Sequence, residues 1–266
     1  MTPGSPAGIG RTGSADHGSA GPAPSAASPE RVAELTAGLA DVERRLSSAC
    51  EDAGRQRAEV TLIAVTKTWP ASDVAALAAL GVRDVAENKD QEAKAKHAEL
   101  TSVDLRWHFV GQLQRNKARS VVRYADVVHS VDRPELAAAL AGASERHRER
   151  PLDVLLQVDL EEGASAGRGG VTPSAVAALA ADVVASPTLR LLGLMAVAPL
   201  GGDPDRAFAR LAELSAALRE DHPEARWISA GMSSDLESAV RHGATHVRVG
   251  SALLGKRVSG HGSVWP

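Results

Sequence analysis

A regular alternation of short apolar segments with longer amphipathic segments constrains the fold of this chain more than any other feature. It begins at residue 61 and continues for about 195 residues, which is enough for eight strand–helix units. Runs rich in Val, Ile and Leu predict strands, and apolar residues at three- and four-residue steps predict helices. The predicted strands cover residues 61–67, 82–88, 105–111, 126–131, 152–160, 189–197, 225–231 and 245–251. The predicted helices cover residues 70–81, 89–100, 114–125, 133–149, 172–186, 204–222, 233–243 and 252–257.

The predicted strands are continuous apolar runs, as expected for parallel strands that are covered on both faces. Strands that alternate with helices form parallel crossover units, and eight such units predict a single (β/α)8 TIM barrel of the α/β class. The alternative is an open, doubly wound sheet. That fold usually has fewer strands and a glycine fingerprint in its first turn, and the stretch "TKTWPAS" has no such fingerprint.

The chain ahead of the barrel divides into a tail and an extra N-terminal helix. Of residues 1–28, twenty-one are Ala, Gly, Ser or Pro, a composition that favours disorder. Ser28 and Pro29 suit the cap and first turn of a helix that ends near Gly54. We therefore expect a tail over 1–28, one barrel domain over 29–257 and a C-terminal tail over 258–266.

Composition argues against several classes of function. A net charge of -3 and an aromatic content of 3% do not favour nucleic-acid binding. No run of eighteen apolar residues is present, so we expect no membrane-spanning helix. The single cysteine, Cys50, excludes an intrachain disulfide and favours a cytoplasmic protein, with Cys50 as packing. The histidines show no convincing spacing for a metal site.

In a TIM barrel the active site forms where the strands end, so the polar residues at the strand ends are the informative ones. From the first strand to the eighth, these residues and one methionine are Lys67, Glu87, Asn88, His108, Gln112, His129, Ser130, Gln157, Asp159, Met195, Ser229 and Arg248.

Lys67 is the most specific of these candidates. A lysine held in a barrel mouth is partly desolvated, which lowers its pKa and makes the amine a nucleophile towards carbonyl groups. Alternatively, Lys67 forms an ion pair with a carboxylate at the rim, such as Glu87. Position alone does not decide between the two.

Two glycine–serine turns at the ends of the last two strands predict a phosphate site. "SAGMSSD" (229–235) and "RVGS" (248–251) lie where barrel enzymes commonly bind phosphate. Gly231 allows a close backbone approach, and Ser233 and Ser234 are expected at a helix N-terminus. Gly250 and Ser251 repeat the arrangement. Either turn alone would be an ordinary capped turn, but two adjacent copies favour an anion.

A carbonyl-reactive lysine beside a phosphate site suggests a phosphorylated aldehyde. Pyridoxal 5′-phosphate fits, and so does the substrate of a sugar-phosphate aldolase that uses a Schiff-base lysine. Arg248 favours the cofactor, because an inward-pointing guanidinium can donate a hydrogen bond to a pyridine nitrogen.

The motifs "AVTKTWP", "WHFVGQLQRNK", "HSVDR", "GLMAV" and "GMSSDLESAVRHGATHVRVGSALLGKR" resemble those of the pyridoxal phosphate homeostasis protein family. The resemblance covers about residues 30–257. It implies a barrel like the N-terminal domain of alanine racemase, with pyridoxal phosphate bound as an internal aldimine on Lys67. It places phosphate contacts on Ser233, Gly250 and Ser251, backbone contacts near Ser229 and Gly231, and Arg248 at the pyridine nitrogen. Asn88, His108 and Asn116 fall in the second and third family segments.

The chain departs from the family pattern at two positions. Lys89 replaces an aromatic residue that usually follows the asparagine of the second motif. Arg168 lies where the family tends to have a lysine, in the loop after the fifth strand. Arginine keeps the charge but does not form a Schiff base as lysine does, so this position does not supply a second lysine for cofactor transfer.

The family resemblance implies a protein that holds pyridoxal phosphate and buffers or delivers it to apo-enzymes, and that acts as a monomer. A weak amino-acid racemase is the first alternative, and a cofactor-free Schiff-base lyase is the second. Racemisation needs bases on both faces of the substrate, and in alanine racemase a tyrosine of an added domain supplies one. We expect no second domain here, and the only tyrosine, Tyr124, falls in the third predicted helix, where packing is its expected role.

Overall fold

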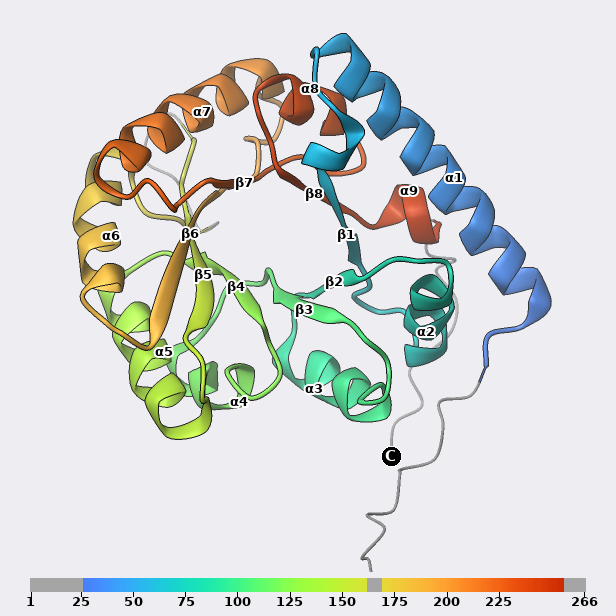
Figure 1. Cartoon of the computed structure of the whole chain (residues 1–266), viewed down its shortest axis with the longest axis horizontal. Helices are drawn as coiled ribbons and strands as arrows, with labels where there is room; N and C mark the ends of the chain where they lie inside the picture. Colours follow the sequence, from blue (N-terminus) through green and yellow to red (C-terminus); the bar gives the residue numbers. More distant parts are fainter. Residues whose placement is uncertain (1–25, 162–168, 256–266) are drawn as a thin grey trace, which may run out of the picture.

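Eight parallel strands close into a barrel in the computed structural model, which describes residues 26–161 and 169–255 (Figure 1). Each strand pairs with its neighbours in the sequence, and the last pairs with the first. This confirms the predicted (β/α)8 fold and excludes the open sheet. The strands are β1 (Thr61–Val65), β2 (Asp84–Glu87), β3 (Arg106–Phe109), β4 (Val127–Val131), β5 (Leu152–Gln157), β6 (Leu189–Met195), β7 (Trp227–Ser229) and β8 (His246–Val249).

A ring of helices surrounds the barrel (Figure 1). Short 3-10 turns, η1 (Arg57–Glu59), η2 (Arg115–Lys117) and η3 (Pro173–Ala175), precede β1, α4 and α6 respectively. The ring helices are α2 (Ala71–Ala79), α3 (Asp90–Glu99), α4 (Ala118–Val121), α5 (Pro134–His147), α6 (Val176–Val184), α7 (Pro204–Asp221), α8 (Leu236–Arg241) and α9 (Ser251–Leu254).

The long helix α1 (Pro29–Asp52) lies outside the ring, against α2, α8 and α9 (Figure 1). It begins where the sequence predicts, because the Ser28 side chain accepts a hydrogen bond from the Arg31 amide. Its apolar stripe faces inward, with Leu35 and Leu46 fully buried. A Cβ at Gly38 would lie 2.3 Å from the Leu253 carbonyl oxygen, so α1 lies directly against α9. Because α9 has only four residues, α1 provides cover that a longer last helix would give.

Buried side chains of the strands face two different regions, the space between the strands and the helices and the inside of the barrel. Most buried apolar side chains form one cluster between the strands and the surrounding helices. Inside the barrel the apolar cluster is small and consists of Val127, Leu155, Leu192 and Met195, with Trp227 packed against it. Ionisable side chains occupy much of the remaining interior, as the site described below shows. The apolar appearance of the strands therefore reflects their outward faces more than their inward ones.

The third unit differs from its sequence prediction. Residues 114–125 were predicted as one helix, but the structure has η2 followed by the single turn of α4. Tyr124 lies beyond α4, not within it, and is 6% exposed. Its hydroxyl donates to Asp90, and its ring lies 6.0 Å from that of His97, so packing remains its role.

Cys50 is buried in the face of α1 that contacts the barrel, as expected for a small packing residue. Across the part of the chain that the structure describes, no helix is both long and apolar enough to cross a membrane.

Candidate functional site

Lys67 lies in a turn two residues after β1 ends, and its side chain is exposed. The sequence prediction that this lysine is partly desolvated in the barrel mouth is therefore wrong. The reason is local, because the strand stops at Val65 and the chain turns outward through Thr66. Within residues 26–161 and 169–255, the Lys67 amine has no hydrogen bond or ion pair. A ligand that covers this turn would have to supply the desolvation.

A buried lysine, Lys96 of α3, donates hydrogen bonds that stabilise the turn carrying Lys67. The Lys96 amine lies 2.7 Å from the Thr66 carbonyl oxygen and 2.7 Å from both Glu87 Oε1 and Glu92 Oε1. The Thr66 hydroxyl donates to Glu87 at 2.6 Å, and the Thr68 amide donates to Glu92. Both residues that flank Lys67 are thus tied to one cluster.

The backbone conformation of Thr68 explains why the turn needs these hydrogen bonds. Its φ of 72° lies in the left-handed region, which a β-branched residue rarely adopts. The hydrogen bond from its amide to Glu92 stabilises this conformation. Lys67 therefore has an exposed side chain on a backbone that is held at both neighbouring residues.

The same cluster settles which lysine pairs with Glu87. The partner is Lys96, not Lys67, and both side chains are almost completely buried. Burial raises the pKa of Glu87 above its ordinary value, although Lys96 opposes that effect. Sequence reasoning missed Lys96. The available signal was its helical spacing from Glu92 and Ala93, which places the lysine on the inward face of α3.

The two glycine–serine turns lie side by side. The Ser233 hydroxyl accepts a hydrogen bond from the Ala252 amide at 3.2 Å and so ties one turn to the other. Gly231 has a φ of 87°, and a Cβ there would lie 2.6 Å from Ala239 Cβ. The glycine is therefore required by conformation and by space.

These turns present unused backbone donors. Within the described part of the chain, the amides of Ser233, Ser234, Gly250 and Ser251 make no hydrogen bond. All four residues are half-buried or exposed. Converging backbone N–H groups form an anion site.

One detail of the prediction changes. Helix α8 begins at Leu236 with Asp235 as its cap, so Ser233 and Ser234 lie in the turn before the helix and not at its N-terminus. Their amides remain available because that turn is not part of the helical hydrogen-bond ladder.

The Lys67 turn adjoins this anion site. An ideal Cβ on Gly250 would lie 3.3 Å from the carbonyl oxygen of Val65 and 3.5 Å from its Cβ. The end of β1, which leads into Lys67, is thus in contact with the second glycine–serine turn. The backbone that leads into Lys67 therefore lies next to the second glycine–serine turn.

Arg248 lies inside the barrel and is 5% exposed. Its guanidinium donates to Ser229 Oγ at 2.7 Å and to the Ala196 carbonyl oxygen at 2.9 Å. Ser229 ends β7, and Ala196 directly follows β6, so the guanidinium is level with the mouth. Burial lowers the pKa of Arg248 to about 10, which leaves it protonated near neutral pH.

His108 lies deeper than a position at the strand end would suggest. It is 1% exposed, and its ring nitrogens lie 2.9 Å from Asp84 Oδ1 and 2.8 Å from His129 Nε2. His129 in turn lies 3.0 Å from Ser229 Oγ. Its contacts therefore connect His108 to Arg248 through other side chains.

Asn88 follows β2 at the mouth, and its buried oxygen, Oδ1, has no hydrogen-bond partner among the residues that the structure describes. A buried carbonyl oxygen without a donor costs free energy, so this atom suits a ligand that donates a hydrogen bond. An ideal Cβ on Gly111 would lie 2.1 Å from the Asn88 carbonyl oxygen, which fixes the Asn88 backbone against the next loop.

The remaining candidates divide between structural and peripheral positions. Met195 belongs to the apolar cluster inside the barrel, and Ser130 is buried. Gln157 donates to the Gly169 carbonyl oxygen, and Asp159 accepts from the Glu161 amide. Gln112 is exposed.

The two departures from the family pattern have different outcomes. Lys89 is exposed at the start of α3. Arg168 lies outside the described residues.

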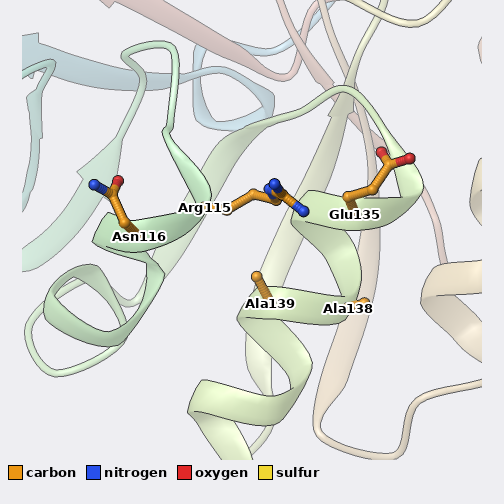
Figure 2. Close-up of a pocket in the computed structure, with 5 residues that line it drawn as sticks. All are labelled: Arg115, Asn116, Glu135, Ala138 and Ala139. Atoms are coloured by element: carbon orange, nitrogen blue, oxygen red, sulfur yellow. The ribbon is translucent and has the colours of Figure 1, made fainter.

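A separate pocket of about 740 Å³ lies beside the mouth, between η2 and α5. It is lined by Arg115, Asn116, Glu135, Ala138 and Ala139 (Figure 2). Figure 2 shows Arg115 extending towards the start of α5, whereas Asn116 points away from it. None of its lining residues belongs to the lysine, phosphate or arginine groups described above, so Asn116 is not brought together with them.

Known proteins resemble this chain over most of its length. Residues 41–258 match the family model described as the N-terminal domain of alanine racemase. A pyridoxal phosphate homeostasis protein of Mycobacterium tuberculosis is 46% identical over 245 residues, which cover 86% of this chain and 95% of the relative. The chain belongs to the pyridoxal phosphate homeostasis protein family.

Other members of the pyridoxal phosphate homeostasis protein family match over similar lengths. The Escherichia coli protein is 38% identical over 231 residues, covering 84% of this chain and 97% of the relative. A solved structure of PipY from Synechococcus elongatus, with PLP bound, superposes with a TM-score of 0.70 at 37% identity. That match covers 80% of this chain and all of PipY.

Alanine racemase from Corynebacterium glutamicum gives a TM-score of 0.61 at 15% identity and covers 88% of this chain and 64% of the racemase. At that identity the likeness concerns the fold alone.

Proposed function

We propose that this chain binds pyridoxal 5′-phosphate in the barrel mouth and holds it for intracellular cofactor homeostasis. The observation that carries the proposal is the contact between the Lys67 turn and the unused backbone donors of the glycine–serine turns. An unpartnered amine and an anion site at one end of a barrel match an aldehyde and a phosphate on one molecule. The PLP named in the PipY structure and the names of the homologues support the same ligand.

The residues present fit the cofactor at each of its polar groups. Amides of Ser233, Ser234, Gly250 and Ser251 would take the phosphate, and Arg248 would donate to the pyridine nitrogen. Asn88 Oδ1, which lacks a donor, would accept a hydrogen bond from the ligand. The Lys67 amine would attack the aldehyde carbon, forming a C=N bond and releasing one water molecule.

Several features favour holding the cofactor over turning over a substrate. Bound PLP supplies an electron sink, which is strongest when its ring nitrogen is protonated. Arg248 remains a cation, so it donates to that nitrogen and disfavours its protonation. Tyr124 is packed away from the mouth against His97, so it is not available as a base there. These features rank a weak racemase below a protein that holds the cofactor.

The test of the lysine assignment is the visible absorbance of the PLP-loaded protein, followed by borohydride reduction and mass spectrometry. We expect an absorbance band of a Schiff base and a reduced adduct on Lys67. Lys67→Ala should lose both. Lys94→Ala changes an exposed lysine on the outer side of α3 and should keep both. Absence of the band and adduct from the unmodified protein would refute the covalent assignment.

The racemase alternative has its own measurement. Interconversion of D- and L-amino acids by the PLP-loaded protein should be absent or very slow. Turnover of about 1 s⁻¹ or faster, typical of ordinary enzymes, would contradict a holding role.

Delivery to PLP-dependent apo-enzymes, action as a monomer and a cytoplasmic location complete the proposal. The exposed position of Lys67 supports delivery, because a recipient protein or a small amine can reach the attachment point without opening the barrel. A single buried cysteine is compatible with a reducing compartment.

A further inference from the structure

A chain of hydrogen bonds runs through the barrel interior from one end to the other. It starts at Asp84, the first residue of β2, and reaches Ser229, the last residue of β7. The links are Asp84 to His108 at 2.9 Å, His108 to His129 at 2.8 Å, and His129 to Ser229 at 3.0 Å. Arg248 then donates to Ser229 at 2.7 Å. Since both imidazoles are almost completely buried, this is not a set of surface contacts.

The chemistry of the members allows only one direction of donation. The Asp84 carboxylate only accepts, so His108 donates to it from Nε2. A neutral His108 then accepts at Nδ1, and His129 donates from its own Nε2. His129 accepts at Nδ1 from the Ser229 hydroxyl, whose oxygen is left to accept from Arg248. Every donor and acceptor along the path is used once.

The charges around the chain support this assignment. Burial lowers the pKa of both His108 and His129, which keeps the two rings neutral near pH 7. Burial would raise the pKa of Asp84, but its contacts with His108 and with the charge of Arg106 outweigh that effect and lower it. Arg106, Arg248 and His246 are the other ionisable groups that act on His129. Arg106 and Arg248 are cations and cannot accept a hydrogen bond in place of Asp84, and the Nδ1 atom of the neutral His246 is bonded to the Thr245 hydroxyl. The Asp84 carboxylate therefore sets the direction.

We propose that Asp84, His108, His129 and Ser229 form a one-way hydrogen-bond relay that orients Arg248 in the barrel mouth. Through this relay, the far-end carboxylate governs the hydrogen bond that Arg248 gives to the ring nitrogen of a bound pyridine cofactor. The second statement rests on the proposed function, whereas the relay itself does not. The four residues act through Arg248 and are positioning residues.

Arg248 is suited to this control because only part of its donor capacity is used by the protein. Two of the five N–H groups of a guanidinium donate to Ser229 and to the Ala196 carbonyl oxygen. No further hydrogen bond from Arg248 is found within residues 26–161 and 169–255. If the relay ran backwards, His129 would donate to Ser229, and the buried hydroxyl proton would lose its acceptor. The contact that sets the angle of the guanidinium would then weaken.

The first test uses the ligand-free protein and nitrogen-15 NMR of its histidines. We expect both His108 and His129 to carry the proton on Nε2 near pH 7. Asp84→Leu removes the terminal acceptor and should leave both rings as mixtures of tautomers. Asp84→Asn keeps an acceptor oxygen and should restore the Nε2–H form.

A matched control lies at the same end of the barrel. Asp153, in the second position of β5, is buried and pairs with Arg106 and Arg190 but is outside the relay. Asp153→Leu should leave the tautomers of His108 and His129 unchanged. Should a leucine variant fail to fold, the Asp84→Ala and Asp153→Ala pair makes the same comparison.

The second test measures PLP binding and the nitrogen-15 shift of the pyridine nitrogen in labelled cofactor. Asp84→Leu should raise the half-saturating PLP concentration about three- to tenfold, as for one weakened hydrogen bond, and shift the ring-nitrogen signal. Asp84→Asn and Asp153→Leu should stay within about twofold of the unmodified protein.

The outcomes separate the two statements. Unchanged tautomers in Asp84→Leu, or an Nδ1–H form in the unmodified protein, would overturn the relay. Changed tautomers with an unchanged ring-nitrogen signal would overturn its control over Arg248. If the unmodified protein binds no PLP, the proposed function and the control of the cofactor both fail, and the NMR result alone decides the relay.

Discussion

Gly231 shows how a single residue determines the shape of the phosphate side of the mouth. Its φ of 87° excludes most side chains, and the space where a Cβ would lie is already taken by Ala239. Lys67 shows the opposite case, because its backbone is fixed while its side chain is exposed. At the residue scale, the candidate site therefore combines backbone donors in conformationally restricted turns with one exposed amine.

Gly231→Ala should destabilise the protein more than an equivalent substitution elsewhere. The positive φ costs about 1–2 kcal/mol for a residue with a Cβ, and overpacking adds about 1–3 kcal/mol. Gly243 has nearly the same φ, 86°, but its nearest neighbour would be Ile228 Cδ1 at 4.0 Å. Gly243→Ala should thus show the conformational cost alone. Urea unfolding of both variants measures the difference, and equal losses would show that the contact with Ala239 relaxes freely.

At the scale of single elements, α3 supports the loop that follows β1. Lys96 reaches from α3 to Thr66, Glu87 and Glu92, and so joins two strand ends to one helix. The cluster is buried, which makes it sensitive to the loss of any one partner. A helix that the sequence describes only as amphipathic thus becomes the support of the Lys67 turn.

Lys96→Met should cost about 3–5 kcal/mol of unfolding free energy, because it leaves the buried Glu87 carboxyl without its cationic partner and removes the Lys96 donor from the Thr66 carbonyl. It should also weaken PLP binding by loosening the Lys67 turn. Lys94→Met, two residues earlier on the exposed side of α3, should change stability by less than about 0.5 kcal/mol.

Adding Glu87→Gln to Lys96→Met should recover part of the loss, since it removes the uncompensated carboxyl group. A double variant no more stable than Lys96→Met alone would mean that the pair contributes little beyond the packing of the lysine stem. Urea unfolding of the unmodified protein, Lys96→Met, Glu87→Gln and the double variant gives the coupling free energy between the two residues.

At the scale of the whole molecule, the barrel interior is a polar column within an apolar shell. Asp84, Arg106 and Asp153 lie at the amino ends of the strands, and His246 stacks on Trp227 with ring centroids 3.7 Å apart. The histidines of this column are neutral in the folded state because burial lowers their pKa values. The folded state therefore keeps these histidines neutral, whereas low pH favours their protonation.

Stability should fall as pH falls below about 6.5, the unperturbed pKa of histidine. Burial lowers the pKa of His246 to about 3, so between these values the unfolded chain binds a proton that the folded chain does not. Each such histidine lowers the free energy of unfolding by up to about 1.4 kcal/mol for every pH unit of acidification in this range.

His246→Gln should reduce that slope by up to about 1.4 kcal/mol per pH unit between pH 6 and pH 4. The measurement is the free energy of urea unfolding at several pH values for both proteins. An identical slope in the variant would contradict the assignment of a neutral, buried His246.

The amino-acid sequence by itself determined the eight strand–helix units and the extra N-terminal helix from Pro29. These features depend on periodicity, capping and turn chemistry, which are local. The tertiary structure decided that Lys67 is exposed, that Lys96 and not Lys67 pairs with Glu87, and that Asp84, His108 and His129 connect to Arg248. These contacts join strands far apart in the chain. They depend on where each strand stops and on which side chains the closed barrel turns inward, and neither is encoded within a short window of sequence.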